Sequence, residues 1–379
     1  MGCGSSGSNG AGDSDLAVNS DGGSLDDLAS GSGDLAPPDL LPPPPSWVYV
    51  SGNSATITRY TLDLQSGALT QKGTTTTTGQ TSFLAIDAPR RHLFAVDEQN
   101  SKVEAFTVDA STGALTHVGT DPGSGGTGPA HLAVDATGKW VLTANYGSGD
   151  VAVLAVAADG SLGAPTALAT APGANAHQIL LDRTNAFAWV PCLGSSHIAQ
   201  FTFDAATGVL APHMPVNVMT ASGGGPRHLA LTPDGKFAYL MEETASTMSN
   251  YSVDAGGNLV VAGQRLSTRA PNPTGTNSGA EVQVHPSGKF LYGSNRGDND
   301  IVLFALASDG SMTYVANKST GGQTPRHFSI DPGGKWLLVG NQGSNDVRVF
   351  AIDGTAGTLT PVGTPMTVTA PTFVGITSF

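Results

Sequence analysis

Short stretches of alternating apolar and polar residues recur along most of this chain, and tight turns separate them. In the stretch 225–254, an apolar alternation at 229–231 leads into a Pro-Asp-Gly-Lys turn at 233–236, and a second apolar run follows at 237–240. Alternation with a period of two on both sides of such a turn is typical of a β-hairpin. A third apolar run, 248–253, follows a polar loop and predicts another strand.

The same plan recurs at intervals of roughly 45–50 residues, which is the spacing of propeller blades. The position of His228 marks each unit, and its equivalents are Phe83, His131, Gln178, Glu281, His327 and Phe373. One four-stranded blade cannot bury both of its faces, so blades stack radially around a central channel. We therefore predict an all-β fold, a seven-bladed β-propeller of four-stranded antiparallel blades.

The two ends of the repeat array complement each other. The last unit stops after the strand-like run 371–376, and the first unit, which starts at Trp47, lacks that strand. Pairing the N- and C-terminal strands in one blade would close the ring and remove two exposed sheet edges. The predicted propeller domain spans residues 46–379.

Residues 1–45 differ from the rest of the chain. They are rich in Gly, Ser, Asp and Pro and contain no Lys, Arg or aromatic residue. Such a segment buries too little apolar surface to offset the entropy of ordering, so we predict a disordered tether. Cys3, followed by a Gly/Ser/Asn linker, resembles the lipidated start of a mature bacterial lipoprotein, and the alternative is an unmodified N-terminus. Lipidation at Cys3 predicts a membrane tether in the cell envelope (periplasm or outer surface); otherwise we expect a cytoplasmic protein.

The composition of the chain restricts its fold class, its partners and its cofactors. The chain has 50 Gly, 24 Pro and only 12% charged residues, which suits short strands joined by turns. Its net charge of −13 argues against nucleic acid as a partner, and no apolar run is long enough to span a bilayer. We find no metal-ligand spacing, P-loop, dinucleotide fingerprint or nucleophile elbow, so we expect neither a metal nor another cofactor. We expect a monomer.

Positions that repeat from blade to blade should be scaffold, and positions that differ should carry function. The hairpin turns repeat a Gly-Lys pair, as at Gly138–Lys139 and Gly235–Lys236. Charge breaks the blade pattern at positions predicted to border the channel, namely at His177, Arg227, Glu243, Arg296 and Arg326. Arg forks pair with carboxylate or phosphate, and a nearby His or Glu can act as a general acid or base. These residues therefore predict a site for an anionic substrate.

Other polar residues at the marker position have two interpretations. His131, His228, Glu281 and His327 either contact the substrate or form hydrogen bonds between blades. In the same way, Arg227 and Arg326 either bind the substrate or pair with a neighbouring carboxylate such as Glu243. His285, in an outer hairpin turn, is expected to be solvated.

Three segments resemble the seven-bladed lactonase family, which includes the propeller-type 6-phosphogluconolactonase of bacteria and the fungal carboxy-muconate lactonising enzyme. They read GPRHLALTPDGKFAYLMEE, HPSGKFLYGSNRGDNDIVLF and TPRHFSIDPGGKWLLVGNQGSNDVRVF, and the resemblance covers about residues 46–379. It implies a catalytic His, two Arg and a Glu at the channel mouth, which fall on His177, Arg227, Arg296 and Glu243. Leu193 and Thr244 depart from the family pattern.

Two functions follow as hypotheses. In the first, the protein is a carboxylic ester hydrolase that opens a small anionic sugar or carboxy lactone. Arg227 and Arg296 would hold the anionic groups, and His177 or Glu243 would activate water toward the ring carbonyl. In the second, it is a non-catalytic, surface-tethered propeller that binds a polymer or protein, which the N-terminal tether favours.

Overall fold

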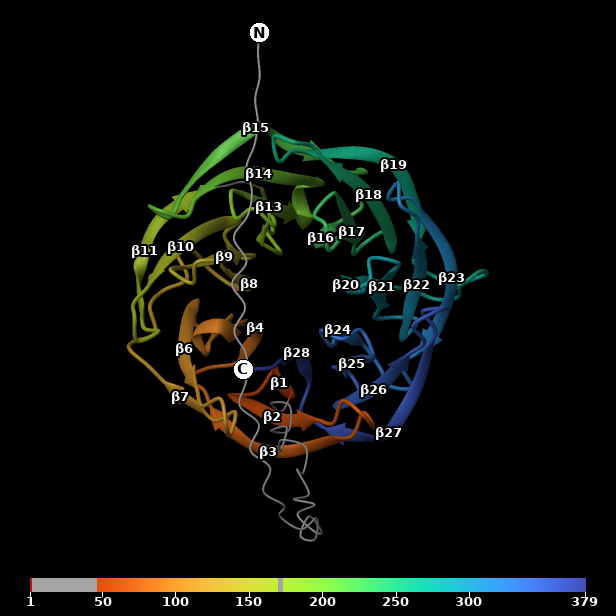
Figure 1. The fold of residues 1–379 in the computed structure, drawn as a ribbon, viewed down its shortest axis with the longest axis horizontal. Coiled ribbons are helices and arrows are strands. Elements are labelled where there is room, and N and C mark those ends of the chain that lie inside the picture. The colour runs from red at the N-terminus through yellow and green to blue at the C-terminus, as the bar shows by residue number, and fades with distance from the viewer. Residues whose placement is uncertain (2–45, 170–172) are drawn as a thin grey trace, which may run out of the picture. The chain divides into compact units, whose positions relative to one another are not determined.

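The structure is a computed structural model that describes residue 1 and residues 46–169 and 173–379. Seven four-stranded antiparallel sheets stand around a common axis, and the innermost strand of each sheet lies next to that axis (Figure 1). This arrangement confirms the predicted seven-bladed propeller. The predictions for residues 1–45, including the lipidation of Cys3, lie outside the described residues.

The strands follow one another from the axis outward in each blade. Blade 1 contains β28 (Pro371–Thr377), β1 (Ser46–Gly52), β2 (Thr56–Leu62) and β3 (Leu69–Thr76). Blade 2 contains β4 (Thr81–Asp87), β5 (His92–Asp97), β6 (Lys102–Val108) and β7 (Leu115–His117). Blade 3 contains β8 (Pro129–Val134), β9 (Trp140–Asn145), β10 (Asp150–Val156) and β11 (Leu162–Ala169). Blade 4 contains β12 (Leu180–Leu181), β13 (Phe187–Cys192), β14 (His197–Asp204) and β15 (Val209–Met219).

The remaining three blades keep the same order. Blade 5 contains β16 (Pro226–Leu231), β17 (Phe237–Glu242), β18 (Thr247–Val253) and β19 (Leu259–Ser267). Blade 6 contains β20 (Gly279–Val284), β21 (Phe290–Asn295), β22 (Asp300–Leu306) and β23 (Met312–Ser319). Blade 7 contains β24 (Pro325–Ile330), β25 (Trp336–Asn341), β26 (Asp346–Ile352) and β27 (Leu359–Thr367). Two 3₁₀ turns, η1 (Ala88–Arg90) and η2 (Leu193–Ser195), complete the described elements, and none of the described helices could span a membrane.

The ring closes as predicted. Strand β28 pairs antiparallel with β1, with Trp47 opposite Thr377 and Val48 opposite Ile376. Because the C-terminal strand is the innermost strand of the blade that the N-terminal strand begins, neither terminus leaves an open sheet edge at the seam.

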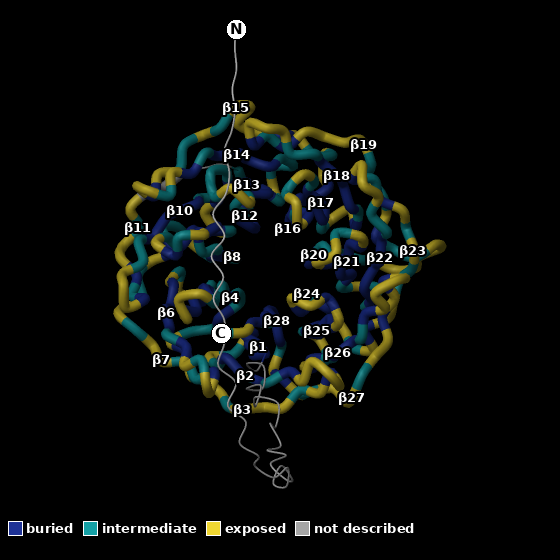
Figure 2. Tube along the Cα trace, in the orientation of Figure 1, coloured by how far each residue is buried: buried dark blue, intermediate teal, exposed yellow. Residues whose placement is uncertain are grey.

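Apolar side chains fill the spaces between blades, and the outermost strand is the most exposed strand of each blade (Figure 2). Most blades also contact the next blade through the polar end of a Tyr or Trp side chain. The hydroxyl of Tyr239 in blade 5 donates to the Gly310 carbonyl of blade 6 at 3.1 Å, and Tyr292 of blade 6 donates to Gly357 of blade 7 at 2.6 Å. Buried Tyr needs such a partner for its hydroxyl, so these contacts fix how one blade seats on the next.

The hairpin turns are scaffold, with one correction. Asp135 caps its own turn by accepting from the backbone N–H groups of Lys139 and Trp140 at 2.9 Å. His285 stands at the equivalent position of blade 6, and it is buried, so the prediction that it is solvated was wrong. Its Nδ1 accepts from the Ser287 N–H at 3.1 Å, and its Nε2 lies 2.8 Å from the Gly334 carbonyl of blade 7. An imidazole is long enough to cap its own turn and reach the next blade, which buries it.

Candidate functional site

The marker side chains from different blades meet at the axis of the ring. Phe83 of blade 2 stacks on His131 of blade 3 with ring centroids 4.2 Å apart, and it lies 5.5 Å from His327 of blade 7. His228 of blade 5 lies 5.6 Å from His131 and 5.0 Å from His177 of blade 4. Positions that are more than 200 residues apart in the chain therefore form one cluster.

Arg227, Glu243 and Arg296 form a second, contiguous group beside this cluster. The two oxygens of Glu243 each contact a guanidinium: Oε2 lies 2.9 Å from Arg227 Nε, and Oε1 lies 2.7 Å from Arg296 Nη2. Arg227 is only 3% exposed, whereas Glu243 is 23% exposed. Of the two interpretations given for Arg227, pairing with Glu243 is the one seen in this structure, and the pair extends to Arg296.

The backbone positions these three side chains at strand ends. Arg227 lies on β16, whereas Glu243 and Arg296 directly follow β17 and β21. The Glu243 N–H donates to the Gly225 carbonyl at 2.6 Å, and the Arg296 N–H donates to the Ser278 carbonyl at 2.9 Å. Because both strands end on hydrogen bonds to the neighbouring innermost segment, both side chains emerge on the same side of blades 5 and 6.

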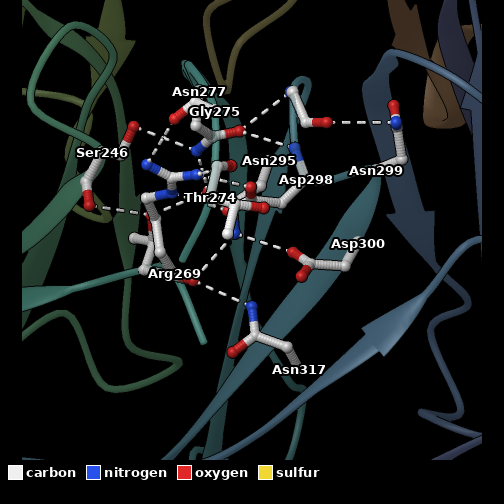
Figure 3. Close-up of polar contacts among 12 residues, drawn as sticks. Ser246, Arg269, Thr274, Gly275, Asn277, Asn295, Asp298, Asn299, Asp300 and Asn317 are labelled. Carbon is white, nitrogen blue, oxygen red and sulfur yellow. Dashed lines mark hydrogen bonds and ion pairs between the residues drawn. The ribbon is translucent and has the colours of Figure 1, made fainter. Parts of the chain in front are cut away.

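A polar network holds the turn that follows Arg296 in the chain (Figure 3). Arg269 makes a bidentate contact with Asp298 at 2.7 and 2.8 Å, and Asn277 Oδ1 accepts from the N–H groups of Gly297 and Asp298 at 2.8 and 3.0 Å. The Asn277 amide also donates to Asn295 at 2.9 Å. Sequence reasoning missed these positioning residues. The signal that marks them is the Pro/Gly/Asn-rich loop 270–278, which makes the interval between the marker positions of blades 5 and 6 the longest of the six.

Glu281 links two histidines across blades. Its Oε2 lies 2.8 Å from Nδ1 of His228 and 3.5 Å from Nε2 of His327. His327 Nδ1 in turn accepts from the Val374 N–H of blade 1 at 3.3 Å. Of the two sequence interpretations for these residues, hydrogen bonding between blades is the one seen for His228, Glu281 and His327. His131 instead stacks on Phe83, and its Nδ1 has no hydrogen-bond partner among the described residues.

Arg326 differs from the other two arginines. No hydrogen bond or ion pair joins its side chain to any residue in the described ranges. Burial and the nearby Arg296 lower the pKa of Arg326, while Glu98 and Glu243 oppose that shift. It lines a small cavity together with His177, Arg227, His228 and His327. An Arg in such a position is available to an anion.

Burial keeps the central histidines neutral. The pKa values of His131, His177 and His228 lie well below the usual value, because burial and nearby Arg227 disfavour the charged form. Burial also lowers the pKa of His327 to about 4 and that of Arg227 to about 9, and it raises the pKa of Glu281. At neutral pH the site thus holds charged arginines next to uncharged imidazoles.

Two cavities adjoin these side chains. The small one, lined by His177, Arg227, His228 and Arg326, has about the volume of a single water molecule. One ring nitrogen of His177 (Nδ1) and one of His228 (Nε2) are buried without a hydrogen-bond partner among the described residues. The larger pocket has a volume of about 400 Å³ and shares Ser82 with the small one. Its lining is polar and carries one acid: Asn53, Gln80, Ser82, Glu98, Gln99, Gly128, Tyr146 and Gly147.

The arrangement suits hydrolysis of a small anionic molecule. The pocket of about 400 Å³ is large enough for a molecule of the size of a sugar, and the arginines can bind negative charge. A neutral imidazole lies beside a space the size of a water molecule and can accept a proton. Tyr146 connects the two spaces, because it lines the larger pocket and its ring lies 5.5 Å from that of His177.

Comparison with known proteins finds relatives over most of the chain. Residues 48–376 match the family model described as "Lactonase, 7-bladed beta-propeller". The 6-phosphogluconolactonase of Pectobacterium carotovorum subsp. carotovorum (strain PC1) is 32% identical over 291 residues, which cover 73% of this chain and 82% of that protein. A similar enzyme from Serratia proteamaculans (strain 568) is 31% identical over 264 residues, which cover 69% of this chain and 77% of that protein.

Solved structures show the same likeness. The periplasmic gluconolactonase of Pseudomonas aeruginosa superposes with a TM-score of 0.83 at 25% identity, over 88% of this chain and 99% of that one. A protein from Lactobacillus plantarum superposes with a TM-score of 0.79 at 29% identity, over 88% of this chain and all of that one (100%). The likeness thus extends over nearly the whole described propeller.

Proposed function

Because this chain belongs to the seven-bladed β-propeller lactonase family, we propose that it hydrolyses a small anionic sugar or carboxy lactone at the mouth of the central channel. The observation that carries the proposal is Arg326, a cation without a partner among the described residues, in the same small cavity as the neutral imidazole of His177. An anionic lactone supplies the charge that Arg326 lacks, and its ring carbonyl supplies the electrophile.

The substrate is held by charge at one end and by polar contacts along its body. Arg326 binds its anionic group, and Arg227 and Arg296 add positive charge while Glu243 keeps their guanidinium planes in place. The hydroxyl-bearing body occupies the pocket of about 400 Å³ that Gln80, Glu98 and Tyr146 line. Carboxylate and amide groups such as these accept and donate the hydrogen bonds that a sugar offers.

His177 is the general base in this mechanism. The two oxygens of Glu243 are both engaged by guanidinium groups, so Glu243 is a poor acceptor for a further proton. His177 is uncharged at neutral pH because burial and the nearby Arg227 lower its pKa, and its Nδ1 has no other hydrogen-bond partner among the described residues. It is therefore free to take a proton from water.

The reaction consumes one water molecule. As His177 removes its proton, the water oxygen attacks the ring carbonyl, and an arginine stabilises the negative oxygen of the tetrahedral intermediate. The bond between the carbonyl carbon and the ring oxygen then breaks, and the ring oxygen takes up the proton from His177. The product is the open hydroxy acid, and neither an oxidant nor a cofactor takes part.

The test is hydrolysis by the purified chain of 6-phosphogluconolactone, glucono-δ-lactone and a carboxy-substituted lactone, each followed by acid release at constant pH. The proposal requires saturable turnover of at least one anionic lactone above the uncatalysed rate. If none of the three is hydrolysed faster than without protein, the interpretation as a non-catalytic binding propeller replaces it. The ratio between the phosphorylated and unphosphorylated sugars identifies the anionic group that the site prefers.

We also propose that the protein works in the cell envelope, with Cys3 as its lipid-bearing residue. The lipoprotein-like sequence around Cys3 supports this location, and the similar Pseudomonas aeruginosa enzyme is periplasmic. In the source organism, the native protein should fractionate with membranes, and a Cys3→Ser form should not. Equal distribution of the two forms between the membrane and soluble fractions would contradict the tether.

A further inference from the structure

Blade 2 carries a group of metal-ligand side chains far along its sheet from the cluster at the axis. Glu104 lies on β6, His117 ends β7, and Asp121 follows in the next loop. One ligand atom from each of the three lies within 4.8 Å of the others. We propose that these residues form a binding site for a divalent transition-metal ion such as Zn²⁺.

The burial of Glu104 distinguishes this group from an ordinary ion pair on the protein surface. Glu104 is 0% exposed, and it stands at the third position of the third strand of its blade. The equivalent residues of the other blades are small, apolar or, in one blade, cationic: Thr58, Ala152, Ala199, Ser249, Val302 and Arg348. No other blade has a carboxylate at this position. Glu104 therefore departs from the repeat, as we expect of a residue that has a function.

The charge of this carboxylate is not balanced by a cationic side chain. Glu104 accepts from the backbone N–H groups of Thr78 at 2.9 Å and Gly79 at 3.4 Å, and no Lys or Arg of the described ranges forms an ion pair with it. The nearest other carboxylate is Asp121, and one oxygen of each carboxylate lies within 4.8 Å of the other. A buried carboxylate next to a second, partly buried one favours a bound cation.

The fold of blade 2 is altered where it delivers the other two ligands. Strand β7 has 3 residues, whereas the outermost strands of the other blades have 8 to 11. After His117 the chain stays alongside β6, because the Val118 N–H donates to the Ala105 carbonyl at 2.9 Å and the Pro122 carbonyl accepts from the Val103 N–H at 3.0 Å. The residues between Val118 and Pro122 bulge out of this pairing, and Asp121 lies beside His117, with Asp121 Oδ1 at 2.7 Å from His117 Nε2.

The donor set selects the kind of ion. One imidazole nitrogen with two carboxylates suits Zn²⁺ and its neighbours better than Mg²⁺ or Ca²⁺, which prefer oxygen ligands alone. His117 is 37% exposed at its side chain, so the ion has a route from solvent and an open position for water. A bound metal ion would stabilise the outer edge of blade 2, where strand β7 is short. The inference does not depend on the lactonase proposal.

The experiment uses the untagged full chain after treatment with EDTA and removal of the chelator. We expect calorimetric titration with ZnCl₂ to give about one ion per chain, and saturating Zn²⁺ to raise the Tm by a few degrees. MgCl₂ and CaCl₂ should give little or no heat at the same concentrations. A Zn²⁺ titration without stoichiometric binding would overturn the proposal.

Variants locate the site. Glu104→Gln, which keeps the shape of the buried side chain, and His117→Gln, which changes an exposed one, should each weaken Zn²⁺ binding about tenfold or more. Asp109→Asn, in the exposed turn before β7, serves as the matched control and should bind like the parent chain. If Glu104→Gln does not fold, the His117→Gln result decides alone. Undiminished Zn²⁺ binding by His117→Gln would place the metal elsewhere and refute this site.

Discussion

The hairpin turns and the inner strand ends of this propeller come from the same repeat, yet they use their polar residues in opposite ways. At the turns, Gly138 and Gly235 adopt φ of 65° and 72°, and polar groups of the preceding residues, such as Asp135, cap their own turn. At the inner strand ends, Arg227, Glu243 and Glu281 contact residues of other segments and blades. Repeated residues therefore satisfy local backbone, and residues that differ between blades act together.

His285 marks the limit of this contrast. It stands at a turn, but it breaks the Asp pattern and contacts blade 7 through Gly334. Even at a turn, a residue that departs from the repeat thus contacts another blade. If this contrast holds for function, substitutions at the inner strand ends should affect activity, whereas substitutions at the turns should not.

The largest effect should follow from removing the proposed base. His177→Ala should lower kcat on an anionic lactone by about 10²–10⁴-fold, which is the usual contribution of a positioned general base. The variant should still melt cooperatively, because the substitution removes ring packing but no hydrogen bond between Nδ1 and the described residues. Steady-state kinetics beside thermal melts would separate the two. An active His177→Ala protein would shift the role to His228, whose Nε2 is also buried without a hydrogen-bond partner among the described residues.

A smaller effect should come from the unpaired arginine. Arg326→Ala should reduce kcat/KM on an anionic lactone by roughly tenfold to a hundredfold, the value of one charge-assisted contact. An uncharged lactone of the same ring size is the internal control, because it has no group for Arg326 to bind. Equal losses on both lactones would show that Arg326 maintains the fold of the site and does not recognise charge.

Acid should act on the inner cluster before it acts on the turns. Because the pKa of His327 falls from 6.5 to about 4 in the folded chain, the unfolded chain binds a proton that the folded chain excludes. Stability should therefore fall as the pH drops from about 6.5 toward 4, with a slope of at most about 1.4 kcal/mol per pH unit from this residue. Glu281, His228, His131 and Arg227 are the ionisable groups that act on it.

The measurement is chemical denaturation between pH 7 and pH 4, with His327→Gln as the comparison. The variant should lose less stability over this range than the parent chain, even if it is less stable at pH 7. Parallel curves for the two proteins would mean that His327 titrates normally in the folded state.

The smallest effect should follow from changing the scaffold turn. The Lys236 side chain is 72% exposed, and its ammonium lies 3.2 Å from Asp234. An exposed pair of this kind contributes little, so Lys236→Ala should alter the free energy of unfolding by no more than about 0.5 kcal/mol and leave kinetics unchanged. A loss of activity in this variant would break the division between turns and inner strand ends.

By itself, the sequence determined the number of blades, the closure of the ring and the residues that stand near its axis. A hairpin signal is local and a repeat is periodic, so strand positions and the pairing of 371–376 with the first strand follow without knowledge of distances. The pattern breaks at His177, Arg227, Glu243 and Arg296 likewise needed only the alignment of the units.

Only the tertiary structure decided which of these residues are partners. That Glu243 holds two arginines while Arg326 has no partner among the described residues depends on how side chains from different blades are directed across the axis. The same holds for Arg269, which pairs with Asp298 in the turn after Arg296, and for Asp121, which lies in a bulge after β7 with one oxygen within 4.8 Å of Glu104. Repeats determine where backbones lie, but contacts between blades depend on side-chain length and rotamer, which no local pattern encodes.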